Sequence, residues 1–148
     1  YALSIACAGL VLFLSLISYD SADPSWNSAG TASYIHNWMN KPGAFLSDIL
    51  LQTLGLGSFV FVFTLFAWSA RTYRRESIRP IWLRIIALLA SSVFLSVAFA
   101  KISSFGWLVH PYLGSASGTL ILTKLSLLAQ NYIPFIGSTI IILLSALC

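Results

Sequence analysis

The chain has 148 residues, of which 58% are hydrophobic and only 8% are charged, and its mean hydropathy is +0.88. An ordinary soluble domain carries about 25% charged residues, so this composition excludes a soluble globular domain, and the low charge also excludes intrinsic disorder. The net charge of +4 comes from unevenly placed basic residues, which indicates membrane topology before nucleic-acid binding. We therefore predict an all-α membrane protein.

The first apolar run covers residues 1–18 and is predicted to be a membrane span. As a helix it would extend about 27 Å, close to the thickness of the hydrocarbon core. A signal peptide is the alternative, but the run lacks a basic n-region and a clear small-residue cleavage pattern. The polar residues 19–42 are predicted to form a loop outside the bilayer. Because the sequence opens at Tyr1 and stops at Cys148 inside apolar runs, we expect a piece of a larger protein.

The next apolar stretch, residues 43–70, is too long for one perpendicular crossing. It would extend about 42 Å as a helix against about 30 Å of hydrocarbon, so it must break or tilt. Residues 44–54 carry polar side chains on one side, and Gly55 and Gly57 then interrupt the run. The pattern predicts a short amphipathic interfacial helix followed by a second span over residues 56–70.

The one basic cluster of the sequence follows this second span. It consists of Arg71, Arg74, Arg75 and Arg79. Because the outer loops hold only Lys41 and Lys101 as permanent cations, the arginine loop is predicted to be cytoplasmic, with both chain ends on the same side. A cation-binding or DNA-binding patch is the alternative, but topology alone accounts for the arginines, so we expect no direct contact with DNA.

The third span is predicted over residues 81–100. Ser92, Ser96 and Ala100 recur there at every fourth residue and place small side chains along one stripe. Such a stripe lets a neighbouring helix approach closely. The alternative interpretation is that these small side chains face lipid and have no packing role.

After a polar loop over residues 101–117, the apolar segment 119–148 is again too long for one span. Polar residues at helical spacing open it, and Asn131, Pro134 and Gly137 break it before a fourth span over residues 134–148. Those helical positions are Thr119, Thr123, Ser126 and Gln130. Since Gly43 and Gly118 hold equivalent positions, the four transmembrane helices are predicted to form two parallel repeats in a single domain, each with an amphipathic outer-face helix.

Sequence motifs for catalysis are missing. The chain has no GxxxxGK[ST], HExxH or GxSxG sequence and no paired carboxylates, and Cys7 and Cys148 lack metal-site or disulfide spacing. We therefore predict no enzyme activity, catalytic residue, cofactor or metal. His36 and His110, in the outer loops, are interpreted as interface residues, with pH sensing or metal binding as the alternative.

Two charged residues in apolar surroundings, Asp48 and Lys124, come from matching parts of the two repeats. Each is expected to snorkel separately to the headgroups and water, and a charge pair between them, within one subunit or between two, is the alternative. They also motivate an alternative function, a small ion or proton channel or transporter subunit. The outer-loop tryptophans Trp26, Trp38 and Trp107 are candidate partner contacts.

Several short motifs together carry a resemblance to a known family. SYDSADPSW at residues 18–26 is followed by His36-Asn37 and by GAFLSD at residues 43–48. This pattern resembles the amino-terminal four-helix membrane domain of the FtsK/SpoIIIE family of DNA translocases. The resemblance covers essentially the whole chain, including Trp68 with the arginine exit from the second span and the glycine-led final pair of helices.

The resemblance implies a cell-division protein that acts in chromosome segregation. Its membrane domain would anchor at the division septum in the bacterial inner membrane, contact lipid and other divisome proteins, and form a homo-oligomer, a hexamer by analogy. A long linker would tether a cytoplasmic ATPase motor that pumps DNA, and neither is present in this sequence. A DNA-conducting pore would have to be built by many subunits, because no single span offers a row of polar or basic side chains.

Overall fold

The computed structural model describes residues 1–25, 34–76 and 80–132. These ranges form α1 (Ala2–Ile17), α2 (Asn40–Leu54), the 3-10 helix η1 (Gly55–Ser58), α3 (Phe59–Tyr73), α4 (Ile81–Ala98) and α5 (Ser115–Tyr132). They contain no β-strand, only an isolated bridge between Ser103 and Tyr112. The all-α prediction is confirmed for this part of the chain, whereas the predicted fourth span, residues 134–148, and its bend lie outside the described residues.

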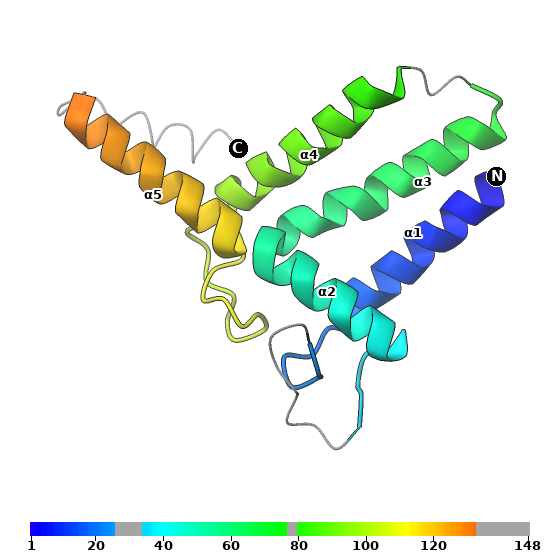
Figure 1. The fold of residues 1–148 in the computed structure, drawn as a ribbon, viewed down its shortest axis with the longest axis horizontal. Coiled ribbons are helices and arrows are strands. Elements are labelled where there is room, and N and C mark those ends of the chain that lie inside the picture. The colour runs from blue at the N-terminus through cyan, green and yellow to red at the C-terminus, as the bar shows by residue number, and fades with distance from the viewer. Residues whose placement is uncertain (26–33, 77–79, 133–148) are drawn as a thin grey trace.

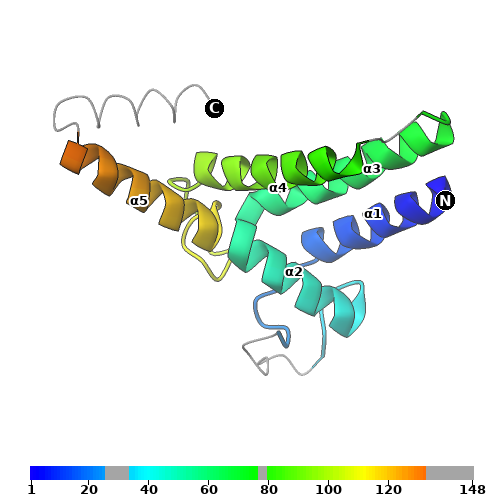
Figure 2. The same ribbon diagram turned by 45° about the horizontal axis from the view of Figure 1, so that its top comes forward.

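Three apolar helices lie side by side. Figures 1 and 2 show α3 between α1 and α4, with the start of α1, the end of α3 and the start of α4 at one end. The end of α1 and the end of α4 lie toward the other end, as two repeats in the same orientation require.

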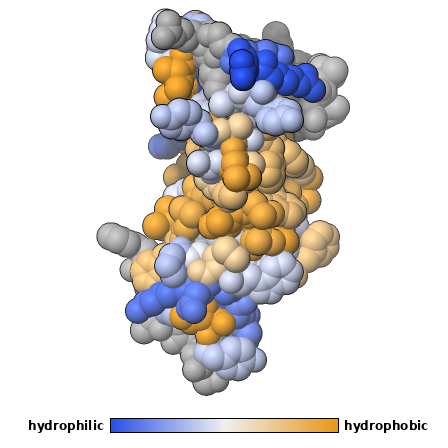
Figure 3. All heavy atoms as spheres, turned by 90° about the vertical axis from the view of Figure 1, so that its right-hand side faces the viewer, coloured by the Kyte–Doolittle hydropathy of each residue, from blue (hydrophilic) through white to orange (hydrophobic). Residues whose placement is uncertain are grey.

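A central apolar band separates two hydrophilic ends on the face shown in Figure 3. Within the described residues, two segments are long and apolar enough to cross a membrane, Asn40–Tyr73 and Ile81–Ala98, and α1 is a shorter apolar helix. Large apolar side chains such as Phe63 and Phe94 point outward from these helices, which is the arrangement expected in lipid.

The predicted break in the second apolar stretch is confirmed. α2 ends at Leu54, η1 follows, and α3 begins at Phe59 in a new direction (Figure 1). The Leu56 N–H leaves the helical pattern and donates to the carbonyl oxygen of Leu113 at 2.9 Å, while Gly55 adopts a left-handed φ of +56°. Glycine adopts that φ without the steric cost that a Cβ brings, so it marks the bend.

The polar side of α2 faces the protein, not the headgroups. Ser47 and Asp48 are buried, whereas the apolar side chains of Leu46 and Ile49 are exposed. In lipid, apolar side chains outside and polar side chains inside are favourable, because the polar groups find hydrogen-bond partners only within the protein. An amphipathic helix is therefore present, with its polar side turned inward.

Two predicted boundaries were wrong by a few residues. α2 begins at Asn40 and α5 begins at Ser115, both inside segments predicted as loops. The first turn of a helix often carries polar residues, because its N–H groups have no partner inside the helix and can bond to water. Such a turn therefore looks like a loop in the sequence.

Candidate functional site

Asp23 holds the connection between α1 and α2. Its two carboxylate oxygens accept the backbone N–H groups of His36 and Asn37, each at 2.8 Å, and the carboxylate is buried. The His36 ring nitrogen Nδ1 lies 3.3 Å from Asp23 and 3.3 Å from Asp20. The buried Asp23 carboxylate, near the start of the loop, therefore holds His36 and Asn37, near its end.

Asn37 joins this loop to both neighbouring helices. Its buried side-chain amide donates to the carbonyl oxygen of Ser15 at 2.9 Å and to the hydroxyl of Ser47 at 3.3 Å, and its Oδ1 accepts the Met39 N–H at 3.0 Å. A Cβ at Gly43 would lie 2.3 Å from Asn37 Oδ1, so only glycine leaves room for this amide. We call Ser15, Asp23, Asn37 and Gly43, with the neighbouring pair Tyr19 and Asp48, the loop junction.

Asp48 has a partner in the loop junction other than Lys124. Its Oδ1 accepts the hydroxyl of Tyr19 at 3.2 Å and the Nε2 amide of Gln52 at 2.7 Å. Burial, reinforced by the Asp48 carboxylate, raises the pKa of Tyr19 above its usual value, so the hydroxyl stays a proton donor.

Lys124 is exposed on α5, and within the described residues no ion pair joins it to Asp48. The chain therefore does not bring the two predicted charges together, and pairing between two subunits stays a prediction. The geometry gives Asp48 a role in holding the loop, through its hydrogen bonds with Tyr19 and Gln52.

A second site of close packing lies where α2, α4 and α5 meet. The predicted stripe is confirmed, since Ser92, Ser96 and Ala100 are all buried. Glycines from the other segments face it. A Cβ at Gly57 would lie 2.2 Å from the Ser92 carbonyl oxygen, and a Cβ at Gly118 would lie 2.2 Å from that of Ser96.

Hydrogen bonds reinforce this contact. The Ser96 hydroxyl donates to the Leu54 carbonyl oxygen at 2.5 Å, and the Ser115 hydroxyl donates to the Gln52 carbonyl oxygen at 2.6 Å. Both acceptors belong to the last turn of α2, whose carbonyls lack partners inside the helix. We call this site the glycine junction, formed by Gly55, Gly57, Ser92, Ser96, Gly114, Ser115 and Gly118.

The equivalent glycines of the two predicted repeats occupy similar settings. Gly43 of α2 lies against Ser15 near the end of α1, and Gly118 of α5 lies against Ser96 near the end of α4. A serine of the preceding apolar helix lies near each glycine, although Gly43 is closer still to Asn37 and Met39 of the loop. This likeness supports the parallel repeat for the described parts of the two halves.

Trp38 and Trp107 lie in the segments between α1 and α2 and between α4 and α5. Trp38 is 65% exposed and Trp107 is 36% exposed, so both are accessible to a partner or to the headgroup region. Trp26 lies outside the described residues.

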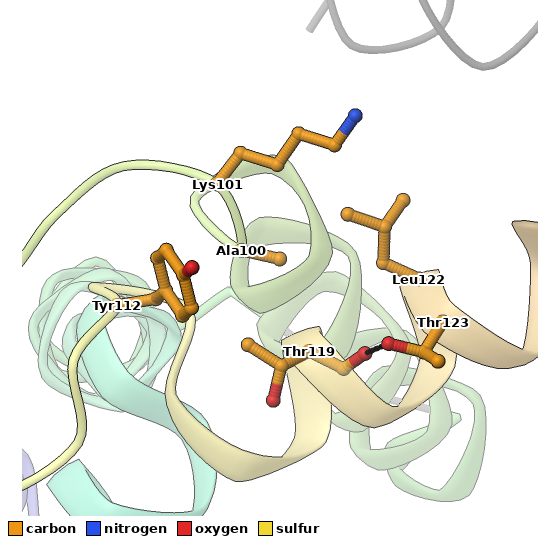
Figure 4. Close-up of a pocket in the computed structure, with 6 residues that line it drawn as sticks. All are labelled: Ala100, Lys101, Tyr112, Thr119, Leu122 and Thr123. Atoms are coloured by element: carbon orange, nitrogen blue, oxygen red, sulfur yellow. Dashed lines mark hydrogen bonds between the residues drawn. The ribbon is translucent and has the colours of Figure 1, made fainter. Parts of the chain in front are cut away.

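A pocket of about 450 Å³ lies beside the end of α4 and the start of α5 (Figure 4). It is lined by Ala100, Lys101, Tyr112, Thr119, Leu122 and Thr123. In Figure 4 the Lys101 amine points away from both threonines, and the Thr123 hydroxyl is already bonded to the Thr119 carbonyl oxygen at 2.7 Å. Its polar groups do not converge on a common point, and the described part of the chain holds no cluster of metal-binding side chains.

A further arginine, Arg84, lies at the end of the helices that carries Arg71, Arg74 and Arg75, which we call the arginine end. Arg71, Arg74 and Arg75 are exposed at the end of α3, and Arg79 lies outside the described residues. Arg84 lies in the first turn of α4, and its buried Nε has no hydrogen-bond partner among the residues that the structure describes. A single cation within the apolar run from Ile81 onward was the signal that would have identified it.

Proteins similar to this chain are bacterial DNA translocases. The sequence profile described as the 4TM region of DNA translocase FtsK/SpoIIIE matches residues 1–148. The chain is 40% identical over 92 residues to DNA translocase FtsK of Rickettsia prowazekii, a match that covers 60% of the chain and 12% of that relative.

Two further relatives carry the same name. DNA translocase FtsK of Azospirillum brasilense is 36% identical over 87 residues, covering 57% of the chain and 14% of the relative. That of Pseudomonas putida is 26% identical over 147 residues, covering 93% of the chain and 17% of the relative. The chain therefore spans less than about a fifth of the length of these relatives, and no solved structure matches it.

Proposed function

Because this chain belongs to the family of four-transmembrane regions of FtsK/SpoIIIE DNA translocases, we propose that it is the membrane anchor and divisome-interaction domain of a septal DNA translocase. The observation that carries the proposal is the family match over residues 1–148. In this proposal the linker and the ATPase motor belong to the rest of the whole protein, and this domain performs no catalysis and makes no direct contact with DNA.

The proposed topology has four spans, at about residues 1–18, 56–70, 81–100 and 134–148, in the bacterial inner membrane. The arginine end and both chain ends are cytoplasmic. The support is that the start of α1 lies at the same end as the arginines, and that Arg84 adds a further cation there. The apolar band in Figure 3 fits the hydrocarbon layer between the two ends.

The loops of the opposite end are the proposed interaction surface for other divisome proteins at the septum. A partner binds a preorganised surface with less loss of conformational freedom than a mobile one. The loop junction provides that order, because Asp23 and Asn37 fix the chain on which Trp38 is exposed. Assembly into a homo-oligomer, a hexamer by family resemblance, is part of the same proposal.

Photo-crosslinking in dividing cells tests this function. A photoreactive amino acid at Trp38 or at Trp107 is expected to capture membrane proteins of the division machinery, because both side chains are accessible in the outer loops. The matched control position is Ile86, which is 56% exposed but lies within the apolar part of α4. Equal capture of the same proteins from all three positions, or capture of no division protein from the tryptophans, would contradict the proposal.

A further inference from the structure

A groove of about 550 Å³ runs between α3 and α4, the two helices joined at the arginine end (Figure 1). Its walls are mainly apolar side chains of both helices, including Phe63, Trp68 and Ala87. Arg71 and Arg84 line its end, and none of the described lining residues is acidic. The groove therefore combines an apolar body with a doubly positive end.

The guanidinium of Arg84 is incompletely satisfied within the described residues. Its Nε is buried and has no hydrogen-bond partner. Side chains of a helix tilt toward its N-terminus, so Arg84 extends toward the end of the groove where Arg71 lies. A buried guanidinium N–H without an acceptor is costly, and a ligand oxygen at this point would remove that cost.

Arg71 is available as a second donor. Its Nε lies 3.8 Å from the Glu76 carboxylate, beyond hydrogen-bond distance, and both side chains are well exposed. Such an exposed pair contributes little free energy and is readily replaced by a better acceptor. Two guanidinium groups at one end of an apolar groove suit a phosphate, which accepts paired N–H donors from arginine.

The length of the groove matches one leaflet of a bilayer. Its lining on α3 extends from Val60 to Arg71, which is about 16 Å at about 1.5 Å per residue. Half of a hydrocarbon core of about 30 Å is about 15 Å. An acyl chain that begins at the arginine end would therefore occupy the groove and end near the bilayer midplane.

We propose that this groove binds one anionic phospholipid, with its phosphate between Arg71 and Arg84 and an acyl chain along Phe63 and Ala87. Basic pockets between transmembrane helices on the cytoplasmic side are known to hold anionic headgroups. The proposal rests on the proposed topology only in assigning the lipid to the cytoplasmic leaflet. The binding itself is independent of any divisome partner.

Native mass spectrometry of the 148-residue chain in neutral detergent tests the binding with added phosphatidylglycerol or phosphatidylcholine. We expect one phosphatidylglycerol to be retained in preference to phosphatidylcholine. The substitution Arg84→Gln is expected to weaken that retention about tenfold, as loss of a charge-assisted contact implies. The matched control Arg74→Gln removes the same charge from the same end outside the groove and is expected to change it less than about twofold.

A second variant keeps both arginines and fills the groove. Ala87→Phe is expected to reduce phosphatidylglycerol retention. Circular dichroism of Ala87→Phe and of Arg84→Gln is the control that tests whether both variants keep the helical content of the unmodified chain. Equal effects of Arg84→Gln and Arg74→Gln would overturn the proposal, because they would indicate a diffuse charge effect. The proposal would also be overturned if phosphatidylglycerol were not retained in preference to phosphatidylcholine. That result is expected if a second copy of the chain or residues 133–148 occupy the groove instead.

Discussion

Replacing Gly55 with alanine is expected to lower the free energy of unfolding of this domain by about 3 kcal/mol or more. A Cβ at this position would lie 1.9 Å from the carbonyl oxygen of Leu113, where two atoms cannot coexist. The backbone cannot easily move away, because the next residue donates its N–H to the same oxygen at 2.9 Å. The left-handed φ of +56° adds a cost of about 1–2 kcal/mol for any residue with a Cβ.

Gly106 provides a matched control for this substitution. It has a φ of +82°, but a Cβ there would meet nothing within 4 Å. Gly106→Ala therefore isolates the backbone cost, and we expect a loss of only about 1–2 kcal/mol. Both variants are compared by denaturant titration in detergent micelles, followed by circular dichroism. Equal losses would show that the close approach to Leu113 is not what the glycine permits.

Asp23→Asn is expected to destabilise the domain by about 3 kcal/mol, with the loss centred on the loop between α1 and α2. The two carboxylate oxygens accept one backbone N–H each, so an amide would place its own NH₂ group against one of these donors. The substitution also removes the negative charge that strengthens both bonds. Because the side chain is only 3% exposed, water cannot replace the missing acceptor.

Asp20→Asn is the control for Asp23→Asn. Asp20 also contacts His36 at 3.3 Å, but its side chain is 39% exposed, and among the described residues it accepts the backbone N–H of Ala22 at 2.8 Å. We expect a loss below about 1 kcal/mol in the same denaturant titration. If the two variants lose equal stability, the buried bonds to His36 and Asn37 do not hold the loop as described.

The features that local patterns encode were predictable from the sequence. The length of the second apolar stretch required a break, and Gly55 and Gly57 marked its place because glycine permits both unusual φ values and close backbone contacts. The spacing of Ser92 and Ser96 likewise identified the face of α4 that other segments approach.

Contacts between distant segments were beyond such patterns. The burial of Asp48 against Tyr19 depends on how α2 folds back onto the end of α1, 29 residues away, and no spacing rule encodes that contact. From the sequence, Lys124 was only a candidate partner of Asp48, since a charge in apolar surroundings indicates that a partner or water is needed but not which residue provides it. The role of Asn37 was hidden for the same reason, because its partners lie on two different helices.

Reporter fusions measure the topology of the domain. A fusion after Arg75 is expected to report a cytoplasmic location, because each arginine costs about 2.5–3.5 kcal/mol to bring to the bilayer centre. Fusions after Asn27 and after Ser115 should report the outside, where the loop junction and the glycine junction are proposed to lie. An outside location for the Arg75 fusion, or a cytoplasmic one for either of the others, would contradict the account.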